Sequence, residues 1–108
     1  MKVHSHFGSG FPEIIYKRAL LLDLDSIGVS YVSEIKKDIH YNGTLIGGRR
    51  LDIIIENKIL LELKAFKELD KVSFVQIINY LKVFDFKVGL LLNFGAESLQ
   101  FKRFLNTR

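Results

Sequence analysis

The sequence predicts one mixed α/β domain of the α+β kind, in which helices flank a mixed sheet of four strands. Three observations predict this class: an amphipathic helical segment near the N-terminus, two strands joined by an Asn-Gly turn, and a later alternation of helical and strand-like segments. The expected order is helix, three strands, helix, strand, helix. With 108 residues and 48% hydrophobic content, the chain is long enough for one core and too short for two. Residues 1–108 are therefore expected to form a single domain.

The first helix is expected to begin at Pro12 and to end before Gly28. Proline suits the first helical position, and glycine suits the residue just past a helix. Apolar residues recur between them at steps of three and four, which predicts a broad buried stripe. Its members are Phe11, Ile14, Ile15, Ala19, Leu21, Leu22 and Leu24. A neighbouring stripe consists of Glu13, Tyr16, Lys17 and Leu20.

A β-hairpin is expected next, formed by residues 29–41 and 44–55. The pair Asn42-Gly43 between them favours a type I′ turn, because both residues tolerate positive φ. Gly47-Gly48 inside the second strand indicates a bulge or a close approach of another backbone.

The rest of the chain is expected to alternate between strands and helices. A third strand over residues 58–65 is followed by a helix over residues 70–84, for which Asp70 is a suitable N-cap. Residues 87–93 form a buried fourth strand, and the helical spacing of apolar residues in 96–105 predicts a last helix.

Asp52, Glu62 and Lys64 interrupt a largely aliphatic stretch, residues 51–65. Side chains alternate between the two faces of a strand, so Glu62 and Lys64 share one face of the third strand. On the second strand, Asp52 lies on the face opposite an aliphatic row. That row consists of Leu51, Ile53 and Ile55.

The turn between these strands decides whether the two acids meet. A two-residue turn would set Asp52 opposite Leu61 and mix charged with aliphatic rows, so it is rejected. A three-residue loop over residues 56–58 pairs Ile55 with Ile59 and keeps the aliphatic rows continuous. In that register Asp52 lies directly across from Glu62.

Two interpretations of this acidic pair follow from the residues alone, and neither is favoured. Like charges that face each other across a sheet repel, so a cation is expected between them. A hard divalent ion such as Mg²⁺ prefers oxygen ligands and keeps several waters, which suits one carboxylate from each strand. The alternative is an exposed hairpin face on which Lys64 forms an ordinary salt bridge with one of the acids.

Asp52, followed on the next strand by Glu62-Leu63-Lys64, resembles the D…(D/E)xK signature of the PD-(D/E)XK nuclease superfamily. The segment GFPEIIY, residues 10–16, is similar to the GxxExxY motif that names one small bacterial family within it. Four blocks resemble that family in their usual order and cover nearly the whole chain: VHSHFGSGFPEIIY, GGRRLDIIIENKILLELKA, QIINYL and GLLLNF. The resemblance implies a restriction-endonuclease-like αβββαβ core. Members carry more sequence before the VH block, so the helix there is expected to be short.

The resemblance also implies a metal site that takes Mg²⁺ or Mn²⁺. Asp52 and Glu62 would be metal ligands, with the Leu63 carbonyl as a third. Glu13 would be the superfamily's helical acid, which assists at the metal directly or through water. From the residue alone, an exposed acid in the first turn of a helix is the commoner role for Glu13.

Further roles follow from the same resemblance. Lys64 would be the catalytic lysine, and Gln76 would be the residue beside it. Tyr80 lies one helical turn from Gln76 on the same face. Tyr16 is expected to pack in the core with its hydroxyl at the rim.

Basic residues near the acids could bind the phosphates of a nucleic acid. Guanidinium and ammonium groups suit phosphate oxygens, although such contacts do not read sequence. The candidates beside the acids are Lys36, Lys37, Arg49 and Arg50. Lys102, Arg103 and Arg108 could extend this surface.

The function expected from these patterns is metal-dependent hydrolysis of phosphodiester bonds in nucleic acid, with DNA favoured over RNA. The alternative is a non-catalytic module that binds nucleic acid or protein and has kept the nuclease fold. A homodimer or a partner subunit that supplies targeting is compatible with either function.

Composition indicates where the protein is found and argues against a zinc site. The chain has no cysteine, a formal net charge of +4, and no apolar run near the ~20 residues that span a bilayer. No signal peptide is recognisable, so we expect a soluble cytoplasmic protein that does not bind membranes. His4 and His6 form an HxH pair, but without cysteine or a third nearby partner a zinc site is disfavoured.

Overall fold

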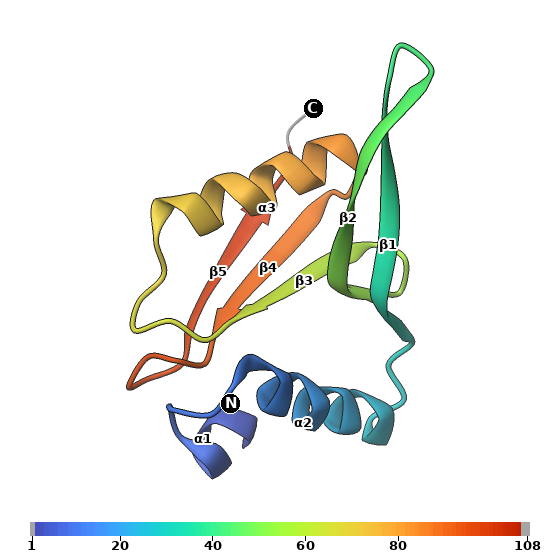
Figure 1. The fold of residues 1–108 in the computed structure, drawn as a ribbon. Coiled ribbons are helices and arrows are strands. Elements are labelled where there is room, and N and C mark those ends of the chain that lie inside the picture. Colours follow the sequence, from blue (N-terminus) through green and yellow to red (C-terminus); the bar gives the residue numbers. More distant parts are fainter. Residues whose placement is uncertain (1, 107–108) are drawn as a thin grey trace.

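The computed structural model of the chain describes residues 2–106. A five-stranded sheet separates two helical layers, with α3 on one side and α1 and α2 on the other (Figure 1). The elements in chain order are α1 Lys2–Phe7, α2 Glu13–Ser26, β1 Tyr31–Tyr41, β2 Thr44–Ile55, β3 Ile59–Lys64, α3 Lys71–Val83, β4 Val88–Asn93 and β5 Gln100–Leu105.

The sheet is mixed, as predicted, but it has five strands instead of four. Its order is β1-β2-β3-β4-β5, with β3 and β4 parallel and every other neighbouring pair antiparallel. The helix predicted over residues 96–105 is therefore wrong, because β5 occupies Gln100–Leu105. The predicted helix over 70–84 is confirmed as α3, whose N-cap Asp70 accepts a hydrogen bond from the Ser73 backbone N–H at 2.9 Å.

Pairing with β4 explains why the last segment is a strand. All six residues of β5 pair with β4, from Gln100 opposite Asn93 to Leu105 opposite Val88. Without β5, the backbone groups along the outer edge of β4 would have no partners. The buried Asn93 amide also donates to Gln100 Oε1 at 2.9 Å and so fixes the start of β5. This non-local pairing overrides the local helical spacing.

The predicted hairpin geometry is confirmed at both of its turns. Asn42 and Gly43 have φ of 50° and 77°, as a type I′ turn requires. Ile55 pairs with Ile59, so the loop between β2 and β3 has the three residues that strand parity demanded. A register shift beside Gly47 marks a bulge, and a Cβ on Gly48 would lie 3.0 Å from the Lys37 carbonyl oxygen.

Two apolar cores lie on the two faces of the sheet. One joins α1 and α2 to Ile53, Leu61 and Leu63, and the other joins α3 to Ile54 and Leu60.

The buried face predicted for the first helix is confirmed only in part. Ala19, Leu21 and Leu24 pack against the core, but Leu22 is 70% exposed. The residues that α2 buries fully belong to the neighbouring stripe, namely Tyr16, Lys17 and Leu20. A charged and an aromatic residue define this buried face, so an apolar pattern alone could not identify it.

The N-terminal block forms a short helix, α1, which packs against α2. His4 is buried there, and its Nε2 lies 3.0 Å from the Ala96 carbonyl oxygen, whereas His6 is exposed. His4 thus joins α1 to the loop after β4. Within residues 2–106, no helix is long and apolar enough to cross a membrane.

Gly95 provides a test of the packing at the end of β3. A Cβ at this position would lie 2.3 Å from the Phe66 carbonyl oxygen, in the segment that follows Lys64. We expect Gly95→Ala to lower the free energy of unfolding by about 1–3 kcal/mol in urea denaturation, because backbone must move. Gly47→Ala is the matched control, since a Cβ there meets nothing within 4 Å. Equal effects of the two substitutions would contradict this packing.

Candidate active site

Asp52 lies where β2 separates from β3. The paired register ends at Ile53 with Leu61, and the next residues along it are Asp52 and Glu62. The Leu63 backbone N–H donates to Asp52 Oδ2 at 2.9 Å. A strand N–H points along the sheet towards its neighbour, so the Asp52 carboxylate fills the gap between the two strands. Since the N–H and C=O of one strand residue point to the same side, the Leu63 carbonyl also faces this gap.

The regular alternation expected for β2 breaks at Asp52. Ile53 belongs to the core under α2, but Leu51 is buried in the core under α3. The partner of Leu51, Ile35, packs in the same core, so β1 changes face at the same point. Between them, Glu34 has φ of 55°, a left-handed conformation that is rare for glutamate. The prediction that Leu51, Ile53 and Ile55 share one face is therefore wrong at Leu51.

Glu62 is buried beside Asp52, with only 6% of its surface exposed. Burial, followed by interaction with the Asp52 carboxylate, raises the pKa of Glu62 to about 9. The charge of Lys64 acts in the opposite direction and is the smaller effect. In the absence of another cation, Glu62 is thus protonated at neutral pH, which relieves the repulsion between the two acids.

Lys17 is a site residue that the sequence analysis did not select. Its side chain is 5% exposed, and its ammonium group forms an ion pair with Glu34 and lies 3.7 Å from Asp52 Oδ1. A buried lysine needs such partners, because an unpaired charge in this position would be costly. Its position in the sequence could have identified it. Lys17 follows Glu13 by four residues and therefore lies on the same helical face as that predicted acid.

Glu13 stands at the first turn of α2 and faces the same group of charges. Partial desolvation, followed by the Asp52 charge, raises the pKa of Glu13, while Lys64 and Lys17 oppose the shift. The predicted helical acid thus lies within electrostatic range of Asp52 and Lys64, at the open side of the site.

Lys64 and Gln76 are brought together as expected. Lys64 Nζ donates to Gln76 Oε1 at 3.1 Å, which joins the end of β3 to α3. Tyr80 has a different environment, since its ring packs 5.8 Å from Phe84 at the edge of the core under α3.

Tyr16 has a structural role in the segment before α2. Its side chain is fully buried, its hydroxyl donates to the Gly8 carbonyl at 2.6 Å, and the same oxygen accepts the Phe11 N–H at 3.1 Å. Gly10, between these two residues, has φ of 112°, which only glycine adopts readily. The core packing expected for Tyr16 is confirmed, but its hydroxyl is buried under the loop that leads to Glu13 and fixes that loop.

The predicted basic residues occupy two separate regions. Lys36 pairs with Arg50 and Lys37 with Arg49 along the β1–β2 hairpin, next to Asp52. Lys102 and Arg103 lie on β5 at the other edge of the sheet, and Lys102 Nζ sits 4.7 Å from the Phe74 ring. Arg108 lies outside the described residues.

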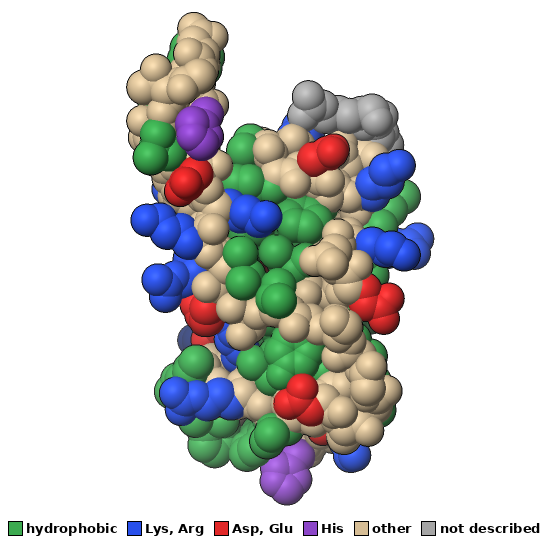
Figure 2. Space-filling model, turned by 90° about the vertical axis from the view of Figure 1, so that its right-hand side faces the viewer, with side chains coloured by type: hydrophobic (Ala, Val, Ile, Leu, Met, Phe, Trp, Pro, Cys, Tyr) green, Lys and Arg blue, Asp and Glu red, His purple; other side chains and the backbone are tan. Residues whose placement is uncertain are grey.

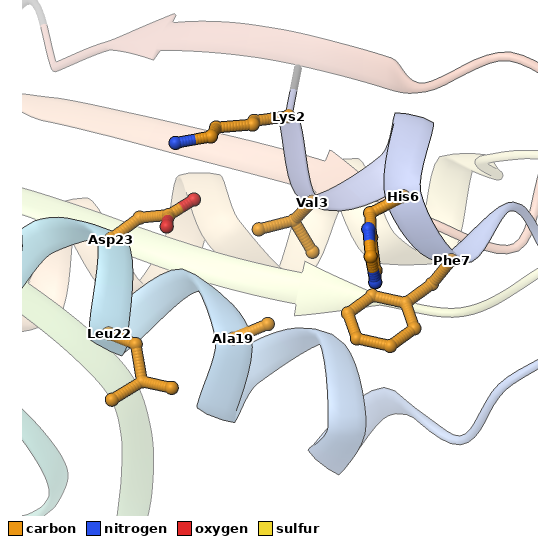
Figure 3. A pocket seen from close by; sticks show the side chains of 7 residues that line it. All are labelled: Lys2, Val3, His6, Phe7, Ala19, Leu22 and Asp23. Carbon is orange, nitrogen blue, oxygen red and sulfur yellow. The ribbon is translucent and has the colours of Figure 1, made fainter.

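A hollow between α1 and α2 lies apart from Asp52 and Glu62 (Figure 3). Its lining is mostly apolar, with Lys2 and Asp23 at one end, and contains none of the predicted site residues. The lining residues are Lys2, Val3, His6, Phe7, Ala19, Leu22 and Asp23.

Comparison with known proteins identifies the family. The sequence model of the PD-(D/E)XK nuclease superfamily matches residues 1–104. The chain belongs to this superfamily.

A solved structure supports the fold of this PD-(D/E)XK protein. The structure titled "Crystal structure of SSO0001" has a TM-score of 0.57 and 22% sequence identity, over 89% of this chain and 53% of that one. The chain thus spans about half the length of that protein. No curated protein matches the chain.

PD-(D/E)XK nucleases generally use divalent metal ions, and the residues here fit such an ion. The donors are all oxygens, as Mg²⁺ prefers, and a cation would replace the proton that the buried Glu62 holds. Among residues 2–106, no group of three or more His, Cys, Asp or Glu side chains is arranged to hold a metal. An ion would therefore have the two carboxylates of Asp52 and Glu62, with the Leu63 carbonyl and water completing its ligands.

The raised pKa of Glu62 predicts how stability depends on pH without metal. Between pH 4.5 and about 9 the unfolded chain releases this proton while the folded protein keeps it. The free energy of unfolding should fall across this window by up to about 1.4 kcal/mol per pH unit. Glu62→Gln should flatten this slope in urea denaturation with EDTA, and Glu56→Gln, in the exposed turn, should not. An unchanged slope in Glu62→Gln would contradict the assignment.

The buried ion pair of Lys17 predicts a loss of stability on its removal. Lys17→Met should lower the free energy of unfolding by about 1.5–3 kcal/mol, because Glu34 and Asp52 lose a charged partner. Arg18→Met, at the exposed neighbouring position, should change it by less than about 0.5 kcal/mol. Adding Glu34→Gln to Lys17→Met should recover part of the loss. Equal effects at positions 17 and 18 would argue against a buried pair.

Proposed function

We propose that this protein hydrolyses phosphodiester bonds in nucleic acid, with DNA as substrate, at a site built from Asp52, Glu62 and Lys64. The observation that carries the proposal is the convergence of Asp52 and Glu62 at the point where β2 leaves β3, next to the Leu63 backbone. Superfamily membership supports the reaction class. We also propose that the protein belongs to the GxxExxY family within this superfamily. The role of the motif residues supports this, since Gly10 and Tyr16 build the loop before Glu13.

Asp52 and Glu62, with the Leu63 carbonyl, would hold one Mg²⁺ or Mn²⁺ ion. Such an ion lowers the pKa of a bound water and offsets charge on a phosphate oxygen. Leu63 N–H fixes one oxygen of Asp52, and Lys17 attracts the other, so the carboxylate is oriented before an ion arrives. Glu13, at the open side, could accept a hydrogen bond from a metal-bound water.

Lys64 would act on the substrate directly. Lys64 is partly buried, and its ammonium group donates to Gln76, which limits its motion. A fixed cation beside the reacting phosphate stabilises the negative charge that develops in the transition state. Gln76 is then a positioning residue, and Tyr80 contributes packing to the same helix.

The activity can be tested on single- and double-stranded DNA and RNA with Mg²⁺ or Mn²⁺. Asp52→Asn should abolish cleavage because it removes a metal ligand, and Lys64→Ala should reduce the rate by about 10²–10³-fold because it removes a fixed charge. Asp85→Asn and Lys67→Ala are matched controls at exposed positions and should retain activity.

Metal affinity separates the roles of these residues. Titration with Mn²⁺ should show weaker binding for Asp52→Asn and Glu62→Gln, and unchanged binding for Lys64→Ala. Cleavage that survives both Asp52→Asn and Lys64→Ala would come from a contaminant and would overturn the proposal. Binding of nucleic acid without any cleavage would instead favour the non-catalytic module.

A further inference from the structure

The β1–β2 hairpin extends beyond the rest of the sheet (Figures 1 and 2). On β2, only Ile53–Ile55 pair with β3, whereas pairing with β1 continues as far as Thr44. We call residues 36–50 the arm. It is a two-stranded ribbon, and its second strand continues along β2 to Asp52.

The arm carries most of the net charge of the protein. It holds four Lys and Arg residues against one acid, Asp38, which gives +3 of the formal +4 of the whole chain. Lys36 lies directly opposite Arg50, and Lys37 directly opposite Arg49. Like charges in such positions destabilise a sheet, so two adjacent pairs of cations indicate an anionic partner.

The two pairs point to opposite faces of the arm, because neighbouring residues on a strand alternate. On the face of Lys36 and Arg50, acids provide partial compensation, since Arg50 Nη1 lies 3.6 Å from Glu34 Oε2. Within the arm, the face of Lys37 and Arg49 carries no acid. A partner must therefore present negative charge to both faces, and most strongly to that of Lys37 and Arg49.

The two strands of a DNA duplex present phosphates in this way. A β-ribbon with its side chains is about 10 Å thick, which matches the ~12 Å width of the major groove. The major groove of double-stranded RNA is too narrow to admit a ribbon, and a single strand has only one backbone.

Two further features of the arm suit entry into a groove. Tyr41, Leu45 and Ile46 at its tip expose apolar side chains, which can contact thymine methyl groups. A Cβ at Gly47 would meet no protein atom, so the backbone there is open to close approach.

The arm also lies at a suitable distance from the acids. Arg50 is two residues from Asp52 on one strand, which corresponds to about 7 Å. Phosphates are spaced by about 3.4 Å along the axis of each DNA strand. Cations of the arm would therefore contact phosphates within a few nucleotides of the bond at Asp52 and Glu62.

We propose that the arm enters the major groove of duplex DNA and that its two cation pairs bind the two phosphate backbones on either side. The proposal rests on the proposed function for the identity of the polymer, and it makes double-stranded DNA the substrate class.

The test is the salt dependence of binding, measured by fluorescence anisotropy in EDTA so that cleavage does not interfere. Each phosphate contact contributes about 0.9 to the slope of log K against log salt for duplex DNA. Lys36→Ala/Arg50→Ala and Lys37→Ala/Arg49→Ala should each lower that slope by about 1.8. Lys58→Ala/Lys87→Ala removes two exposed cations that lie outside the arm, just before β3 and β4, and should leave the slope unchanged.

The choice of nucleic acid gives the second readout. Wild-type protein should bind duplex DNA more tightly than duplex RNA or either single strand. The proposal is overturned if only one pair changes the duplex slope, if the control pair changes it equally, or if both pairs affect single strands as strongly. Binding is measured in EDTA, so a protein that cleaves nothing can still lose salt dependence in both double variants. This separates the inference from the proposed activity.

Discussion

The hydrogen bond from the Leu63 backbone to the Asp52 carboxylate is the constraint around which the site is arranged. It replaces a backbone contact at the point where β2 leaves β3, so the strands can separate without exposing an unpaired N–H. The separation frees the first part of β2 to form the arm with β1. Side chains from both helical layers meet here, since Lys17 on α2 lies near Asp52 and Gln76 on α3 accepts from Lys64.

Electrostatics in this opening follow from burial. Two acids on adjacent strands cannot both be charged at low cost in a dry environment. The molecule reduces this cost in two ways: Lys17 attracts Asp52, and Glu62 keeps its proton. Lys17 and the Leu63 N–H together orient the Asp52 carboxylate. Protonation of Glu62 therefore relieves the repulsion between the two acids.

The features that sequence predicted are those in which a local rule and the fold agree. The length of the loop between β2 and β3 was predictable, because only one length keeps the aliphatic rows together. The N-cap role of Asp70 was predictable too, because an N-cap depends only on the helix that follows it. Strand β5 was not predictable in this way. Its apolar residues have helical spacing, and its pairing depends on the edge of β4, which the local sequence does not describe.

The remaining errors in the prediction lie at the site itself. Lys17 occupies a buried helical position where a pattern search expects an aliphatic residue, and Glu34 adopts a left-handed conformation inside a strand. Leu51 lies in the core under α3, whereas Ile53 lies in the core under α2, and this change of face coincides with the left-handed Glu34 on the neighbouring strand. Each departure carries a local cost, and such costs persist where surrounding contacts enforce them. The buried Lys17 and the left-handed Glu34 are linked, because Lys17 forms an ion pair with Glu34 and also lies near Asp52. Both departures are best explained by the position that they give to the Asp52 carboxylate.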